Sequence, residues 1–251
     1  MIHFYGADEI EAIARAGRIL AALYRAVPER VVPGVTTAGL DRFAEEFIRS
    51  HEGAEPAFKG LYGFPATLCT SVNHEVVHGI PSHRRKLNEG DVVSVDCGVK
   101  LDGYYADAAN TYPVGQVEPE VAALLEKTEA ALHRGIAEAR PGRRLGDVGA
   151  AIQEVADAAG YGVVRELVGH GVGRKPHEEP QVPNYGKPGK GMKLVEGLVL
   201  AIEPMFNLGV PGVRTLPDRW TVVTADRKIS AHFEHTVAVT AAGPRILTDG
   251  S

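Results

Sequence analysis

Two aspartates lie on opposite strands of a predicted hairpin in the segment VDCGVKLDGYYADAANTY. Asp102-Gly103 stands between apolar, β-prone runs, and this dipeptide is a strong signal for a two-residue hairpin turn. With that turn, the ladder places Gly98 opposite Asp107. Asp96 then lies opposite Ala109. Because side chains alternate along a strand, Asp96 and Asp107 share one face on a diagonal, with Cβ atoms roughly 7 Å apart.

Two carboxylates at this spacing repel each other and destabilise the fold unless a positive charge joins them. A divalent cation fits the gap between them. The alternative is a pair of solvated aspartates on an exposed sheet face. Burial is favoured, because the residues that flank the two aspartates are apolar: Val93, Val95, Cys97, Val99 and Ala106.

Three further metal-ligand candidates occur in the second half of the chain. Glu203 closes the apolar strand LVLAIEP, where Pro204 ends the ladder in a manner typical of a sheet edge. Glu234 lies in the alternating segment SAHFEHTVAV, and His170 lies in the glycine-rich segment VGHGVGRKPHEEP. Taken alone, each has a plainer interpretation, as a surface glutamate or a hydrogen-bonded structural histidine.

Together, the four carboxylates and one imidazole form an oxygen-rich set. Such a set suits two hard or borderline divalent ions better than a structural zinc ion. A two-metal site can hold a bridging hydroxide and polarise a carbonyl.

The elements that must position these residues follow one order twice: helix, Pro-Gly, helix, strands. Helices are predicted over 8–27, 37–50, 118–139 and 145–159, and strands over 91–99, 104–114, 197–203, 220–224 and 230–239. Pro33-Gly34 and Pro141-Gly142 divide the helix pairs. The repeated order favours a duplicated α+β unit whose strands form one sheet with helices on a single face, although Pro-Gly breaks also recur by chance. No low-complexity linker separates the halves, so residues 1–251 are predicted to form one catalytic domain.

Composition narrows the class of protein. The 251 residues are 44% hydrophobic and 24% charged, with a net charge of −5, which argues against direct DNA binding. No window approaches the ~18 apolar residues of a membrane span, and no signal peptide is recognised, so a cytoplasmic protein is expected. The basic run Arg84-Arg85-Lys86 indicates a solvated loop or a contact with a phosphate-rich partner.

Five strings in order resemble motifs of the methionine aminopeptidases: SVNHEVVHGIP, VKLDGYYAD, GHGVGRKPHEEPQVPNYG, LAIEPM and HFEHTV. From the first helix to the last strand, the chain resembles the type I, bacterial-like members of this M24 metallopeptidase family. The resemblance implies the pita-bread (creatinase/aminopeptidase) α+β fold. It also implies five ligands for two divalent ions, Co, Mn or Fe: Asp96, Asp107, His170, Glu203 and Glu234.

The resemblance assigns a role to each group. Asp107 and Glu234 would bridge the two ions. Asp96 would belong to one ion, and His170 and Glu203 to the other. Glu203 would also shuttle the proton of the attacking hydroxide.

Two histidines receive roles in substrate binding by the same resemblance. His177 would bind the scissile carbonyl oxygen as negative charge develops on it, and His78 would hold the amide beyond the cleaved bond. Without the motif, hydrogen bonding within loops would be the preferred interpretation of both histidines.

The resemblance also predicts the walls of a methionine pocket, from Phe64, Cys69 and Trp220. Cys69 and Trp220 would otherwise be ordinary core residues. The chain departs from the family pattern at Leu61, where tyrosine is common, and at Pro176, where an aromatic residue is common. These two departures affect the expected shape of the pocket rim and not the chemistry.

A monovalent-cation site is also implied, more weakly, at Asn73 and Ser230. Such a site uses backbone oxygens, which the sequence pattern does not reveal.

The activity that the resemblance implies is removal of the initiator methionine from nascent proteins whose second residue is small. Nascent N-termini and a transient ribosome contact are the expected partners, no membrane partner is expected, and a monomer is expected. An Xaa-Pro-type aminopeptidase of the same fold is the first alternative, although such relatives carry a large additional N-terminal domain. A non-catalytic pita-bread binding protein is the second, although such relatives typically lose metal ligands.

Overall fold

The computed structural model describes residues 2–250 and shows an α+β architecture. The helices are α1 (Ala7–Ala26), α2 (Thr37–Arg49), α3 (Pro119–Glu138) and α4 (Leu145–Ala159), with the short 3-10 helices η1 (Pro28–Arg30) and η2 (Leu61–Gly63). The strands of the first half are β1 (Glu55–Pro56), β2 (Cys69–Val72), β3 (Glu75–Val77), β4 (Val92–Leu101) and β5 (Tyr104–Pro113). Those of the second half are β6 (Gly162–Val163), β7 (Gly169–Gly171), β8 (Glu178–Val182), β9 (Val199–Ile202), β10 (Met205–Asn207), β11 (Val213–Thr215), β12 (Val222–Thr224), β13 (Ser230–His232), β14 (Glu234–Thr240) and β15 (Gly243–Ile246).

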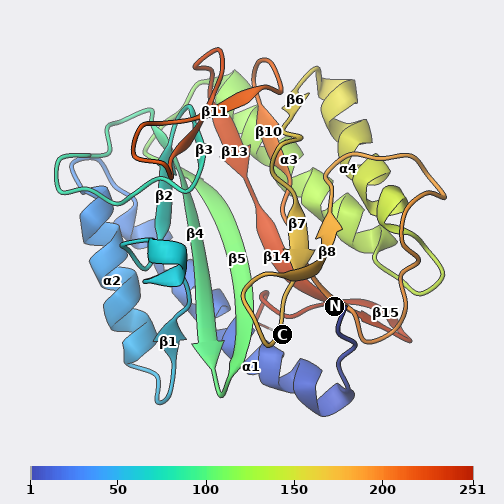
Figure 1. Ribbon diagram of the computed structural model, residues 1–251. Coiled ribbons are helices and arrows are strands. Elements are labelled where there is room, and N and C mark those ends of the chain that lie inside the picture. Colours follow the sequence, from blue (N-terminus) through green and yellow to red (C-terminus); the bar gives the residue numbers. More distant parts are fainter. Residues whose placement is uncertain (1, 251) are drawn as a thin grey trace.

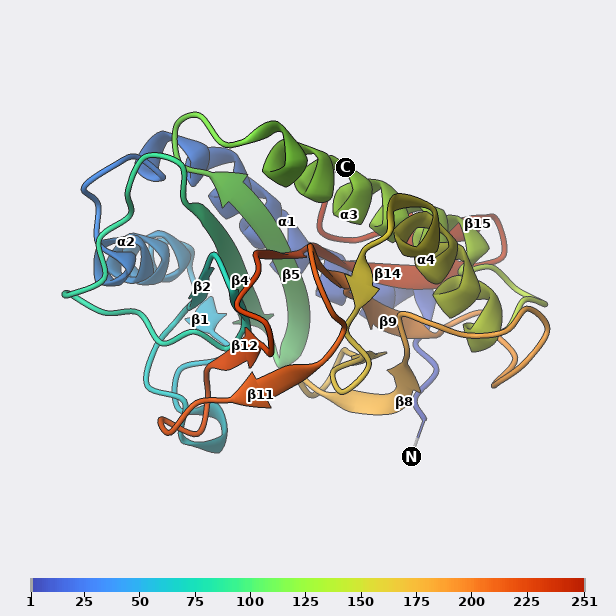
Figure 2. The ribbon, with the colours of Figure 1, turned by 90° about the horizontal axis from the view of Figure 1, so that it is seen from above.

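One antiparallel sheet runs through the molecule in the order β1-β4-β5-β14-β9-β7-β8, with β2 paired to β4 and β15 paired to β14 (Figure 1). The four α-helices lie along one side of this sheet, whereas β11 and β12 lie on the opposite side (Figure 2). The predicted α+β class and the single helical face are therefore confirmed. Two small three-stranded sheets, β13-β10-β6 and β11-β12-β3, were not expected from the sequence.

The helix predictions hold closely because their start and stop signals act locally. α2 begins after Thr36, whose hydroxyl oxygen accepts the Gly39 N–H at 3.1 Å. α4 ends where Gly160 adopts a left-handed φ of 73°, a conformation that favours glycine. In α1, Ile13, Leu20 and Leu23 are fully buried at helical spacing and form the stripe that packs on the sheet.

Each half of the chain has its own apolar core. α1 packs on β4 and β5, and α3 packs on β9 and β14, so each helix pair covers the strands of its own half. This arrangement supports the predicted duplication. None of the helices within residues 2–250 is long and apolar enough to cross a membrane.

The β4–β5 hairpin has the predicted register along its full length. Leu101 pairs with Tyr104, and Gly98 pairs with Asp107. The turn residues Asp102 and Gly103 have φ of 51° and 83°, the positive values that a type I′ turn requires.

Two strand predictions in the second half were wrong in detail. The segment 230–239 is not one strand, because the chain leaves the ladder at Phe233. β13 pairs with β10 in a small sheet, whereas β14 enters the main sheet between β5 and β9. β12 begins at Val222, so Trp220 precedes the strand.

The expected position of Glu203 at a sheet edge was also wrong, because β9 is flanked by β14 and β7 on its two sides.

In the main sheet, the two halves meet where β5 pairs with β14, and this junction is short. The halves also meet where β3 pairs with β12 in a small sheet. Only Glu234↔Ala109 and His235↔Ala108 form ladder pairs between residues 2 and 250 at the β5–β14 junction. The next contact uses a side chain: the Thr236 hydroxyl accepts the Asp107 N–H at 2.9 Å and donates to the Asp107 carbonyl at 2.8 Å. Thr236 thus completes the junction beside a candidate ligand.

Replacement of Thr236 by valine tests this junction. Thr236→Val keeps the shape of the side chain but leaves the buried N–H and C=O of Asp107 without partners, so we expect a loss of about 1–3 kcal/mol in unfolding free energy. Urea unfolding in the presence of a chelator measures the effect without contributions from metal. Thr240→Val is the control, because Thr240 is half-buried and donates to Gly243 farther along β14. Equal small effects of both changes would show that Thr236 does not hold the halves together.

Candidate metal centre

Three carboxylates meet on one face of the central strands because of the register around Ala109. Ala109 on β5 pairs with Asp96 on β4 on one side and with Glu234 on β14 on the other. Asp107 lies two residues before Ala109 and therefore points to the same face. The small side chain of Ala109 leaves space between the three acids.

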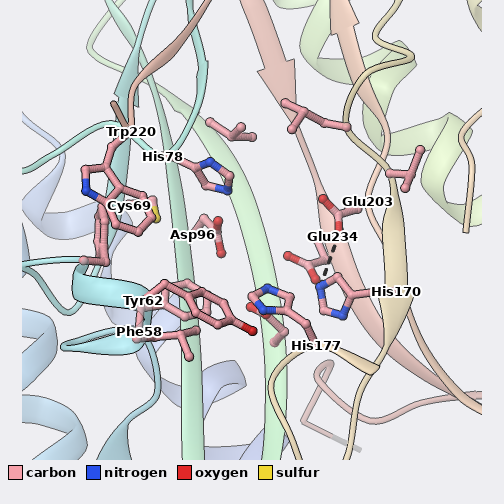
Figure 3. Close-up of a pocket in the computed structure, with 16 residues that line it drawn as sticks. Phe58, Tyr62, Cys69, His78, Asp96, His170, His177, Glu203, Trp220 and Glu234 are labelled. Carbon is pink, nitrogen blue, oxygen red and sulfur yellow. Dashed lines mark ion pairs between the residues drawn. The ribbon is translucent and has the colours of Figure 1, made fainter. Parts of the chain in front are cut away.

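The other two candidate ligands come from neighbouring strands of the second half. Glu203 follows the last residue of β9, and His170 is the middle residue of β7. Figure 3 shows Glu203, Glu234 and His170 facing Asp96 across the cavity. The Nε2 atom of His170 lies 3.5 Å from Oε1 of Glu203.

The ligand atoms fall into overlapping groups of three. In one group, oxygens of Asp96, Asp107 and Glu234 lie within 4.8 Å of one another. In the second, atoms of His170, Glu203 and Glu234 satisfy the same distance. Glu234 belongs to both groups, which is the placement that a bridging ligand needs.

His177 adds a third group that the sequence did not predict. Atoms of Asp107, His170 and His177 also lie within 4.8 Å of one another. Unlike the five predicted ligands, His177 is exposed, and its ring lies edge-on to His170 at a centroid distance of 4.5 Å. It can reach a metal ion or a bound substrate from the mouth of the cavity.

Burial and mutual repulsion make the carboxylates hard to ionise. Burial, followed by the charge of Asp107, raises the pKa of Asp96 well above its usual range. Burial raises the pKa of Asp107 to about 7, and burial followed by neighbouring carboxylates raises the pKa values of Glu203 and Glu234. Across residues 2–250, no lysine or arginine forms an ion pair with any of the four acids.

The unpaired oxygens indicate what is needed to complete the cluster. Asp96 Oδ1, Asp107 Oδ1 and Glu234 Oε1 are buried and accept no hydrogen bond from the described residues. Buried polar atoms are normally paired, and leaving one unpaired costs about 1–3 kcal/mol. A divalent cation would pair all three oxygens at once. The oxygen-rich donor set with one imidazole fits a hard or borderline ion.

Both predicted substrate-binding histidines line the same cavity, on opposite sides of the acids. His78 follows β3 with a left-handed φ of 59°. Burial, followed by the charge of His177, lowers the pKa of His78 to about 4, so its ring is neutral at pH 7. A neutral imidazole can donate from one nitrogen and accept at the other.

The acids lie at one end of a cavity of about 290 Å³ whose other end is apolar. Its wall includes the three predicted pocket residues, Phe64, Cys69 and Trp220, and Phe64 meets Trp220 edge-to-face at 5.1 Å. Of the two departures from the family pattern, Leu61 lines the cavity and Pro176 does not. The sequence missed the other apolar wall residues, which are Phe58, Val77, Leu167 and Val168.

Tyr62 is a further cavity residue that the sequence did not single out. Its ring stacks on His177 at a centroid distance of 5.9 Å and an interplanar angle of 19°, and its side chain is 75% exposed. Its backbone has φ of 51°, a rare value for a bulky residue. The flanking Gly60 and Gly63 in the string GLYGF also have positive φ, and they were the one available signal of this turn.

His232 was also missed, although it stands two residues before Glu234. It is fully buried, and its Nε2 atom lies 3.9 Å from Oε2 of Glu203. Neither ring nitrogen has a hydrogen-bond partner among residues 2–250. An i, i+2 pair of polar residues in an apolar strand was the signal that could have found it.

The residues predicted to hold a monovalent cation lie together but outside the main cavity. The carbonyl oxygen of Asn73 accepts the Ser230 N–H at 2.9 Å. The Asn73 side chain donates to Asp91 at 2.7 Å and accepts the Val92 N–H at 2.9 Å.

Comparisons with known proteins agree with this geometry. The model of metallopeptidase family M24 matches residues 11–241. A methionine aminopeptidase of Clostridium perfringens is 53% identical over 248 residues, which cover 99% of each chain.

Two solved structures of known proteins have a similar fold. The crystal structure of methionine aminopeptidase from Thermotoga maritima matches with a TM-score of 0.97 and 44% identity, over 99% of each chain. The prolidase of Pyrococcus furiosus matches with a TM-score of 0.79 and 25% identity, over 98% of this chain and 65% of that one. The pita-bread α+β fold expected from the sequence is confirmed.

Stabilisation by bound metal distinguishes a metal ligand from a residue that only lies nearby, because only loss of the ligand removes the stabilisation. Glu234→Gln keeps the size of the side chain but removes one charge from both overlapping groups. We expect the chelated variant to be at least as stable as the parent, because repulsion is relieved, and to lose the stabilisation that Mn²⁺ provides. For the parent, that stabilisation is about 2.7 kcal/mol at 100 times the dissociation constant.

His177→Ala is the matched comparison. It is expected to keep most of the stabilisation that Mn²⁺ provides, because all five predicted ligands remain. Thermal unfolding with chelator and with Mn²⁺ measures both variants. A Glu234→Gln protein stabilised as strongly as the parent would contradict a metal centre at Glu234. Loss of the effect in His177→Ala would make His177 a ligand.

Proposed function

The chain belongs to metallopeptidase family M24, and from that premise we propose that it is an aminopeptidase that removes an N-terminal methionine when the second residue is small. The observation that carries the proposal is the cluster of four carboxylates, three buried and Glu203 partly buried, with one imidazole at the end of an apolar cavity. An enzyme that cuts after a single apolar residue needs this combination. The named relatives that match over nearly their full length support the choice of methionine.

The metal ions that the family implies are assigned to the predicted ligands. We propose two divalent ions, Co, Mn or Fe, with Asp107 and Glu234 shared between them. Asp96 completes one set of ligands, and His170 and Glu203 complete the other. When bound, such ions lower the pKa of water and polarise a carbonyl oxygen.

The side chains around the ions supply the remaining chemistry. Glu203 accepts a proton from the attacking water and delivers it to the leaving nitrogen, a role that suits a carboxylate with a raised pKa. His177 donates to the scissile carbonyl oxygen as negative charge develops there. His78 is neutral and holds the amide nitrogen of the second residue.

The apolar end of the cavity explains the preference for methionine. The wall of Phe64, Cys69 and Trp220 suits an unbranched thioether, because methionine is flexible and sulfur packs favourably on aromatic edges. The second residue must pass between His78 and His177, where Tyr62 stacks on the latter. A large second side chain has little room there.

The Xaa-Pro-type alternative has weaker support. The prolidase of Pyrococcus furiosus shares 25% identity with this chain, against 53% for the clostridial methionine aminopeptidase. The non-catalytic alternative is disfavoured because all five predicted ligands are present and close together.

The setting of the enzyme follows from its substrate. We propose that residues 1–251 act as one catalytic domain and as a monomer on nascent polypeptide N-termini in the cytoplasm, with a transient contact at the ribosome. A monovalent cation at Asn73 and Ser230 belongs to the same proposal.

A panel of tripeptides compared by kcat/KM tests the proposed function. Met-Gly and Met-Ala starts should exceed Met-Lys and Met-Phe starts by about 100-fold, which corresponds to about 2.7 kcal/mol. Peptides that begin with a charged or branched residue should not be cleaved. Norleucine in the first position should lose only about 1–3 kcal/mol, because an apolar pocket discriminates weakly between similar side chains. If Xaa-Pro peptides without methionine were the best substrates, the chain would act as the neighbouring class of peptidase.

A further inference from the structure

A second cavity of about 500 Å³ adjoins the proposed active site. The two cavities share Val168, His170 and His177, so the imidazole pair stands between them. The wall of the second cavity carries several polar side chains, and it continues with His3, Gly169, Lys175, Glu178, Glu179 and Gln181. No role of the proposed catalytic residues uses this space, which is called the β8 groove below.

The positions of the cavity residues give the substrate a direction. The proposed function places the first side chain of the substrate against Trp220 and Cys69, which lie across Asp96 from His170 (Figure 3). The scissile carbonyl then lies near His177. Tyr62 stacks on the His177 ring within the first cavity, and His170 lies against the same ring. The β8 groove begins at these two histidines, so it is the nearest space for the rest of the polypeptide.

Hydrogen bonds hold the wall of the β8 groove in place. The buried Tyr5 hydroxyl donates to the Glu178 carboxylate, with oxygens at 2.8 and 2.9 Å, and accepts the Arg174 N–H at 3.0 Å. Glu178 also accepts the Lys175 N–H at 2.9 Å. These bonds pin the loop that carries His177, so the groove is formed before a peptide binds, and binding then orders fewer groups.

β8 borders the groove and ends the main sheet, so part of its outer edge has no strand partner. β8 is the last strand in the order of the main sheet, and Figure 2 shows it beside the N-terminal segment. Within residues 2–250, its outer side makes one bridge, between Ile2 and Glu179, and Pro180 in the middle of the strand has no N–H to donate. Gln181 is exposed beyond that bridge. An edge strand can pair with an added extended chain through main-chain hydrogen bonds, which do not depend on the peptide's sequence.

We propose that the β8 groove is a binding site for the fourth and following residues of the polypeptide substrate. This inference rests on the proposed function and extends it to longer substrates. Backbone pairing at β8, with Lys175 and Gln181 as side-chain partners, would serve an enzyme that acts on many different protein N-termini. The groove therefore favours long polypeptides over tripeptides without selecting their sequence.

The test compares the tripeptide Met-Ala-Ser with the hexapeptide Met-Ala-Ser-Ser-Thr-Ser. The parent enzyme should show a higher kcat/KM for the hexapeptide, through a lower KM. The double variant Lys175→Ala/Gln181→Ala should lower kcat/KM for the hexapeptide about 2- to 10-fold, the range of one lost hydrogen bond. Its kcat/KM for the tripeptide should not change, since neither residue belongs to the catalytic machinery.

Lys127→Ala/Gln116→Ala is the matched control, because both residues are exposed and line neither cavity. It should leave both substrates unchanged. The proposal is overturned if the parent does not distinguish the two peptides, or if the groove variant keeps the full advantage of the hexapeptide. Failure of the parent to cleave the tripeptide would count instead against the proposed function.

Discussion

Four carboxylates that lie close together and away from water are the constraint on which the structure depends. Burial and mutual repulsion raise their pKa values, and three of their oxygens have no hydrogen-bond partner among the described residues. A protein that needed only a stable core would fill this space with apolar side chains, since buried charges seldom improve stability. The cluster is therefore a functional feature that the fold must support, and bound cations would relieve the repulsion between the carboxylates.

The duplicated architecture explains how the fold supports the cluster. Each of the two apolar cores is built mainly from one half. Each half contributes part of the ligand set: Asp96 and Asp107 from the first half, and His170, Glu203 and Glu234 from the second. The site forms where the halves join. In the main sheet they join through two ladder pairs and the Thr236 hydroxyl. Hydrogen bonds between Thr111 and His232 and the pairing of β3 with β12 add to this junction.

Local signals made much of the fold predictable. The Asp102-Gly103 turn fixes the register of β4 and β5, and register alone places Asp96 diagonal to Asp107. The failures came from interactions between distant segments. The break at Phe233 depends on pairing with β10, and the left-handed Tyr62 and the buried His232 take their places from packing across the halves. The five ligands were grouped from motif resemblance, because pattern alone cannot show that β7, β9 and β14 lie side by side.

The most direct test of a metal-dependent site is the rate of methionine release from Met-Ala-Ser by one preparation in three states: as isolated, exhaustively demetallated, and reconstituted with Mn²⁺, Fe²⁺ or Co²⁺. The buried carboxylate cluster predicts that demetallation abolishes release and that at least one of these ions restores it. Full activity in the demetallated protein, verified by elemental analysis, would contradict the metal centre and the function built on it.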